Sequence, residues 1–311
     1  MSINKLASKS DRVGAAIFMI ILTDCVVSIA DAVIKVTVSG MPLSQLIFLR
    51  ACVTSVCLLA ILKLYFPRVS LLPIRPGWAI LRSLFILVSL LFYYASLPRL
   101  DFSMAAAVYY TIPLFITLFA TVWLKEPVGL QGWAGVAIGF MGVLLMLKPQ
   151  TGSLSIYALM PLASANFFAL SVIVTRTRSR AENPFVLALM SNATAVVIGG
   201  LASATTWIAG ENALGWSGDS VLLGPWIEMD WSLWWVIILL SMAMLIGSVG
   251  TAVAYQLGPP SVISIFDFSY LAFAVLWSIV LFGERIDAIS MLGIALIALA
   301  GIIVTRRRMA R

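Results

Sequence analysis

The sequence predicts an all-helical membrane protein, and three observations support this fold class. Hydrophobic residues make up 62% of the 311-residue chain and charged residues only 11%, less than half of the roughly 25% that a soluble domain carries. The mean hydropathy is +1.06. Apolar runs of about 20 residues, the length that crosses a hydrocarbon core of about 30 Å, alternate with clusters of Lys and Arg. Most of the surface is therefore expected to face lipid.

The apolar runs predict ten membrane-spanning helices. The first run contains Asp24, Asp31 and Lys35 and has no small-residue cleavage site after it, so we expect a retained helix rather than a signal peptide. The ten expected spans are 13–37, 43–65, 77–97, 101–123, 129–147, 154–175, 184–209, 232–256, 261–282 and 287–305.

The distribution of basic residues predicts the orientation. With a cytoplasmic N-terminus, fifteen of the 20 Lys and Arg residues fall in inside segments and three in outside segments, in agreement with the positive-inside rule. Ten spans then leave both termini in the cytoplasm of a bacterial cell, and we expect an inner (plasma) membrane protein. The acidic, Trp-rich segment 210–230 lies outside on this count. It fits either an aromatic belt with a solvated loop or a lid.

A shift of 158 residues aligns the two halves of the chain. It brings Glu126 onto Glu284, each in a short polar turn before a Gly-rich helix. Each half holds five spans, an odd number, so the second copy must enter the membrane from the opposite side. Such inverted repeats place a site near the midplane between the copies. We expect two five-helix repeats, residues 1–150 and 151–311.

Several short stretches carry a resemblance to a known family: Asp31-Ala-Val-Ile-Lys35, Phe48-Leu-Arg50, Tyr94-Ala-Ser-Leu-Pro-Arg-Leu-Asp101, Tyr110-Thr-Ile-Pro113-Leu, Trp123-Leu-Lys-Glu126 and Phe282-Gly-Glu284-Arg. Together they resemble the EamA type of the drug/metabolite transporter superfamily over nearly the whole chain. The resemblance implies gradient-linked movement of a metabolite and cytoplasmic termini. The relatives that the resemblance implies are similar to exporters of amino acids and to carriers of S-adenosylmethionine and riboflavin. The second half departs from the first, because Asp267 stands where Tyr109 does and no proline matches Pro113.

The charged side chains that fall inside the expected spans include Asp24, Asp31, Lys35, Arg50 and Asp267. Each needs a partner or water, because a charge at a helix centre costs at least ~2.5 kcal/mol. Asp24 and Asp31 are seven residues apart and share a face, whereas Asp31 and Lys35, four apart, can form a structural ion pair or a gate. The chain has no histidine, so Asp24 and Asp267 are the proton-coupling candidates. Arg50 is expected either to bind a carboxylate or phosphate group of the substrate or to neutralise Asp24 or Asp31 of the first span.

Aromatic and amide side chains at mid-span predict a substrate cavity. Buried Tyr and Asn must find hydrogen-bond partners, so each one alone also fits interhelical bonding. With Arg50, the expected substrate-binding residues are Tyr94, Tyr109, Tyr110, Asn166, Phe168 and Tyr270. Pro113 is expected to act as a hinge in the fourth span. The Gly135-Val-Ala-Ile-Gly139 motif permits close helix approach. We expect it to pack span five against span ten within a monomer rather than to form a homodimer.

The sequence therefore predicts a secondary active transporter for a small organic metabolite. The substrate is expected to be an amino-acid-like zwitterion or a planar heterocycle, moved by alternating access with proton coupling. A flippase for a lipid-linked substrate is the alternative. An intramembrane enzyme is disfavoured, because no phosphate loop, metalloprotease or serine-hydrolase motif is present. We expect no cofactor or metal, and the net charge of +7 is assigned to inside loops rather than to nucleic-acid binding.

Overall fold

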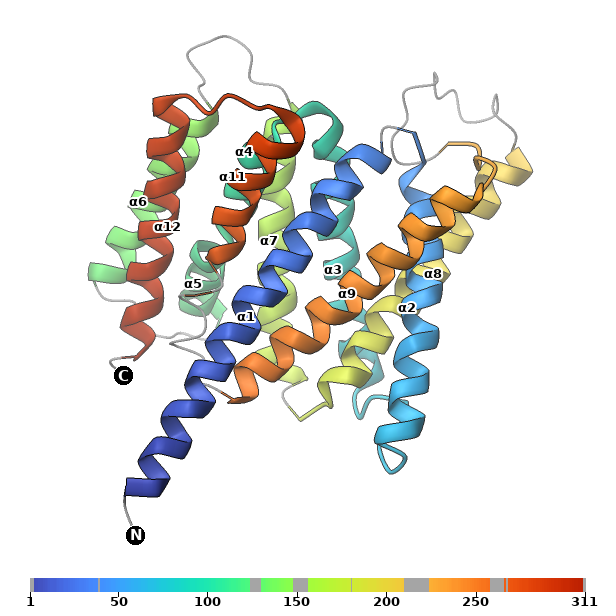
Figure 1. Cartoon of the computed structure of the whole chain (residues 1–311), viewed down its shortest axis with the longest axis horizontal. Helices are drawn as coiled ribbons and strands as arrows, with labels where there is room; N and C mark the ends of the chain where they lie inside the picture. Colours follow the sequence, from blue (N-terminus) through green and yellow to red (C-terminus); the bar gives the residue numbers. More distant parts are fainter. Residues whose placement is uncertain are drawn as a thin grey trace. The chain divides into compact units, whose positions relative to one another are not determined.

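The computed structural model describes residues 3–38, 40–123, 130–147, 156–179, 181–209, 224–257, 266 and 268–309, and all regular secondary structure in these ranges is helical (Figure 1). The helices are α1 (Ile3–Thr37), α2 (Leu43–Tyr65), α3 (Pro76–Ser96), η1 (Leu97–Arg99), α4 (Phe102–Tyr109), α5 (Ile112–Trp123), α6 (Leu130–Leu147), α7 (Ile156–Arg178), α8 (Pro184–Ala209), α9 (Trp231–Leu257), α11 (Ser269–Phe282) and α12 (Ala288–Met309).

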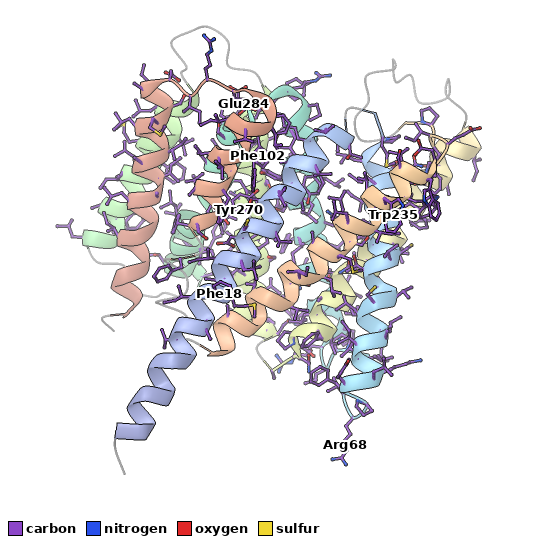
Figure 2. The ribbon with its side chains drawn as sticks, viewed as in Figure 1. Phe18, Arg68, Phe102, Trp235, Tyr270 and Glu284 are labelled. Carbon is purple, nitrogen blue, oxygen red and sulfur yellow. The ribbon has the colours of Figure 1, made fainter. Side chains whose placement is uncertain are left out.

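The helices have the length and composition of membrane spans. Among the described residues, seven helical stretches are long and apolar enough to cross a membrane, and three shorter apolar helices lie at Trp133–Leu145, Ser269–Phe282 and Ala288–Ala300. Many large apolar side chains face outward, among them Phe18 of α1 and Trp235 of α9 (Figure 2), as expected where lipid is the solvent. The predicted all-helical membrane class is confirmed, and the count of ten spans stays a prediction.

The fourth expected span is two helices rather than one. α4 ends at Tyr109 and α5 begins at Ile112, with Tyr110 and Thr111 between them. Pro113 lacks the N–H that an unbroken helix would donate to the carbonyl of Tyr109, which explains a break immediately before the proline. The sequence placed a helix break here, and its role as a hinge stays a prediction.

The described helices form two compact units. Unit 1 comprises Met1–Ala32, Asp101–Leu154 and Ile246–Arg311, and unit 2 comprises Val33–Leu100 and Ser155–Leu245. Each unit takes segments from both halves of the sequence. The units therefore differ from the predicted repeats 1–150 and 151–311, and that division of the chain stays a prediction.

In unit 1, α6 packs against α12 through glycines (Figure 1). A Cβ added to Gly139 would lie 3.1 Å from the Cβ of Ala300, and one added to Gly142 would lie 2.9 Å from Ile297. Gly139 aligns with Ile297, and Gly142 with Ala300, under the 158-residue shift. The contacts are thus reciprocal, as they are in an isologous two-fold pair. Packing of span five against span ten within one molecule is confirmed.

The carboxylate of Glu284 joins α11 to the start of α4 in unit 1 (Figure 2). α11 ends at Gly283, whose φ of 61° lies in the left-handed region that suits glycine. The next residue, Glu284, accepts hydrogen bonds from the backbone N–H of Phe102 at 2.7 Å and from the Ser278 hydroxyl. A carboxylate at this position satisfies an N-terminal N–H and complements the dipole of α4.

Unit 2 is held by close helix pairs of its own, α2 with α8 and α3 with α7 (Figure 1). Phe48 of α2 lies against Gly199 and Gly200 of α8, where an added Cβ would come within 3.2 Å and 3.1 Å of it. The hydroxyls of Ser89 on α3 and Ser164 on α7 are 2.9 Å apart. Small and hydroxyl-bearing residues at such contacts are typical of membrane helix pairs.

Candidate functional site

The buried face of α1 in unit 1 carries two carboxylates that bind α11. Asp24 accepts a hydrogen bond from the Ser269 hydroxyl at 2.7 Å, and Asp31 accepts one from the Tyr270 hydroxyl at 2.6 Å. Between them, Ser28 accepts a bond from the indole N–H of Trp277 at 3.0 Å. The shared face of Asp24 and Asp31 that their spacing predicted is confirmed, since both side chains are buried and both bond to α11.

Tyrosines at the break of the fourth span lie next to these carboxylates in unit 1. The rings of Tyr110 and Tyr270 stack with centroids 4.8 Å apart and planes 15° from parallel, and we call this pair the tyrosine stack. Tyr109 and Phe268 contact Tyr110 edge-on, at 6.2 Å and 6.0 Å. The structure thus brings together the expected site residues Tyr109, Tyr110 and Tyr270 with Asp31.

Asp267, the other proton-coupling candidate, lies outside the described residues. Its neighbours Phe266 and Phe268 are described, and Phe268 contacts the tyrosine stack as stated above. The part assigned to Asp267 therefore stays a prediction.

Arg50 lies in unit 2, where it is buried against Tyr94. Its guanidinium donates a hydrogen bond to the Tyr94 hydroxyl at 3.1 Å and lies 5.4 Å from the ring centroid. The backbone carbonyl of Arg50 accepts bonds from Thr54 at 2.9 Å and Ser241 at 3.3 Å. α2 and α9 are therefore joined at this residue, and two expected substrate-binding residues, Arg50 and Tyr94, are in direct contact.

The remaining expected residues of unit 2 lie on α7 and at the end of α1. Asn166 and Phe168 are half-buried on α7, beside Phe167, whose ring stacks on Phe92 of α3 at 5.8 Å. Lys35 donates a hydrogen bond to the backbone carbonyl of Leu100 at 2.8 Å. Lys35 thus ties the end of α1 to the segment that follows η1.

Sequence reasoning missed two buried polar contacts of unit 2. Arg82, counted only as an inside charge, lies within α3 and bonds Thr175 and Ser191. Gln45 exchanges two hydrogen bonds with the backbone of Ile227, both 3.0 Å long. A polar residue inside an apolar run was the available signal for both. In the described part of the chain no cluster of three metal-ligand side chains occurs.

Comparison with known proteins finds transporters that are similar to parts of the chain. Residues 14–148 match the EamA-like transporter family. A riboflavin transporter of Vibrio cholerae is 27% identical over 47% of this chain and 49% of that protein. An S-adenosylmethionine uptake transporter of Rickettsia prowazekii is 28% identical over 48% of this chain and 50% of that protein. The first half of the chain is therefore similar to the EamA-like transporter family. Both of these relatives are named as transporters.

An exporter matches over a greater length. A pseudopaline exporter of Pseudomonas aeruginosa is 22% identical, over 96% of this chain and 98% of the exporter. The chain spans only about half the length of the riboflavin transporter that it matches. One solved crystal structure of a protein superposes with a TM-score of 0.63 at 20% identity, covering 96% of this chain and 99% of the other, and shows a shared fold.

Proposed function

We propose that this protein is a drug/metabolite transporter that moves a small organic substrate by alternating access, coupled to the proton gradient across the bacterial inner membrane. The observation that carries the proposal is the pair of buried carboxylates on α1, Asp24 and Asp31, each bonded to a hydroxyl of α11. Ionisable groups inside the membrane are expensive and typically mark ion or substrate pathways.

Proton coupling follows from the chemistry of these bonds. An ionised carboxylate accepts a hydrogen bond from Ser269 or Tyr270, whereas a protonated one also becomes a donor. Taking up a proton therefore changes the contact between α1 and α11 within unit 1. A device that couples a proton to a helix contact needs no histidine, and the chain contains none. Asp267 is a third candidate carrier on the same proposal.

A planar heterocycle is the favoured substrate class, ahead of an amino-acid-like zwitterion. The tyrosine stack offers aromatic faces beside the Asp31 carboxylate, and aromatic rings stack well on flat heterocycles. Two relatives are named for riboflavin and S-adenosylmethionine, and both of those molecules contain such a ring system. Within unit 2, Arg50 is held by Tyr94 and stays a predicted substrate-binding residue, because a guanidinium suits a carboxylate or phosphate group.

The proposed mechanism uses ten spans arranged as two inverted repeats, with both termini in the cytoplasm and a monomer as the working unit. The reciprocal contacts of α6 and α12 support an internal two-fold relation. The break before Pro113 is the proposed hinge, because non-helical backbone inside a membrane protein is tolerated where it lines a cavity or packs against protein.

Reconstituted liposomes provide the test. The purified full chain is assayed for riboflavin, S-adenosylmethionine and a neutral amino acid, with and without a pH gradient. We expect saturable flux of at least one heterocycle that the gradient accelerates, and loss of that acceleration in Asp31→Asn, Asp24→Asn or Asp267→Asn. Asp230→Asn is the matched control, because Asp230 is exposed at the start of α9.

Three outcomes oppose the proposal. Full gradient-driven flux in all three aspartate variants would remove the proton-coupling role. Flux of the amino acid alone would reassign the substrate class. Scrambling of labelled lipid without solute flux would favour the flippase.

A further inference from the structure

Arg82 is a membrane-embedded cation that the proposed transport site does not use. It lies in α3, within the candidate span Pro76–Arg99, and is half-buried. Its Nε donates to the Thr175 hydroxyl of α7 at 2.8 Å, and one terminal nitrogen donates to the Ser191 hydroxyl of α8 at 3.0 Å. Three helices of unit 2 therefore meet at this guanidinium.

The partners of Arg82 orient its charge without neutralising it. The Thr175 hydroxyl donates a hydrogen bond to the carbonyl of Ser171, and the Ser191 hydroxyl donates one to the carbonyl of Leu187. Both hydroxyl oxygens therefore present lone pairs to the arginine. A guanidinium has five N–H donors. The two bonds leave three N–H groups that have no partner among the residues described.

A second guanidinium lies one helical turn away on the same helix pair. Arg178 lies over the ring of Trp78, 4.9 Å from its centroid. Trp78 precedes Arg82 by one turn of α3, and Arg178 follows Thr175 by about one turn of α7. The two cations thus lie at neighbouring levels of the antiparallel α3–α7 pair.

The acidic side chain at this end of unit 2, Glu182, is hydrogen-bonded to the backbone. Glu182 accepts hydrogen bonds from the backbone N–H groups of Ile74 and Arg75, at 2.9 Å and 2.8 Å, one for each carboxylate oxygen. It therefore caps the start of α3 instead of pairing with Arg82 or Arg178. In the described part of the chain, neither guanidinium has a carboxylate partner.

We infer that Arg82 and Arg178 bind the phosphate of an anionic phospholipid headgroup. Arg binds phosphate through several charge-assisted hydrogen bonds, and basic pockets between membrane helices near the cytoplasmic face suit anionic headgroups. Apolar side chains flank the two cations, and Trp78 and Ile80 are 38% and 43% exposed. The acyl chains of a bound lipid would cover these exposed apolar side chains, whereas a free phosphate ion would not. The occupant is therefore expected to be a lipid. The sequence places this end of unit 2 on the cytoplasmic side.

The test measures lipid binding and is independent of transport. The purified full chain in a nonionic detergent is titrated with phosphatidylglycerol, phosphatidylcholine or inorganic phosphate, and bound lipid is counted by native mass spectrometry. We expect phosphatidylglycerol to bind the natural chain about tenfold more tightly than phosphatidylcholine, the size of effect that a charge-assisted contact supplies. Inorganic phosphate at matched concentration should not compete.

Arg82→Gln and Arg178→Gln should each reduce the lipid preference to about twofold or less. Arg68→Gln is the matched control, because Arg68 is exposed beyond the end of α2 and points away from the helices (Figure 2), and it should keep the preference. Arg178→Gln leaves the hydroxyl bonds of Arg82 intact, so it tests the site even if Arg82→Gln does not fold.

Two results would overturn the inference. One is an unchanged lipid preference in Arg178→Gln, or an equal loss in Arg68→Gln, either of which would leave Arg82 a purely structural link between helices. The other is displacement of lipid by inorganic phosphate, which would reassign the site to a free anion.

Discussion

Replacing Gly142 with alanine tests the close approach of α6 and α12. The new Cβ would lie 2.8 Å from the carbonyl oxygen of Gly293, whereas ordinary contacts begin at 3.4 Å, so the helices must separate by about 0.6 Å. The obstacle is backbone and cannot rotate away, which places the overpacking cost at about 2–3 kcal/mol. Alanine returns about 1 kcal/mol of helix propensity. We expect a net loss of about 1–2 kcal/mol in the free energy of unfolding.

Thermal unfolding of the purified full chain in detergent measures this loss as a fall of a few degrees in Tm. Gly14→Ala is the control, since nothing lies within 4 Å of its added Cβ, and it should be neutral or slightly stabilising. Gly139→Ala should fall between the two, because its nearest obstacle is the flexible side chain of Leu114. If Gly142→Ala matched Gly14→Ala in Tm, the reasoning about this helix contact would be refuted.

Three further predictions concern polar contacts. Tyr270→Phe removes the donor to Asp31 but keeps the ring, so the unfolding free energy should fall by about 1.5–3 kcal/mol; an unchanged Tm would contradict a buried bond. Glu284→Gln removes the negative charge at the start of α4, so the free energy of unfolding should fall by about 1 kcal/mol. An unchanged Tm would argue against a role of this carboxylate in capping α4. The bond from the Leu233 N–H lowers the pKa of Asp230. Its stabilising effect is therefore complete above the ordinary aspartate pKa and is lost as pH falls through the lowered value, so hydrogen exchange at Leu233 should quicken only below about pH 4.

Most of the fold could be predicted from the sequence, because the thickness of the membrane fixes how long each apolar run must be. The predicted starts at 43, 184 and 287 lie within one residue of the observed starts of α2, α8 and α12, at Leu43, Pro184 and Ala288. The fourth span was predicted as one membrane crossing, 101–123, and consists of two helices. Hydropathy does not detect that break, and Pro113 was its one signal in the sequence.

The candidate site could be predicted only in part. The seven-residue spacing of Asp24 and Asp31 fixes their common face, because helical periodicity sets the direction of side chains on one helix. Their partners Ser269 and Tyr270 could not be found in this way, since a contact also depends on the rotation and register of the second helix. Arg82 was overlooked because composition does not separate an arginine at a span boundary from one buried between helices.

The bonds between α1 and α11 have a consequence for any titration of the protein. Ser269 and Tyr270 are consecutive residues, yet their acceptors Asp24 and Asp31 are about 10.5 Å apart along α1 at 1.5 Å per residue. The short serine and the long tyrosine thus link one turn of α11 to two levels of α1. A tilt of that turn would alter both bonds together, so a proton taken up by either carboxylate is expected to disturb the hydrogen bond of the other.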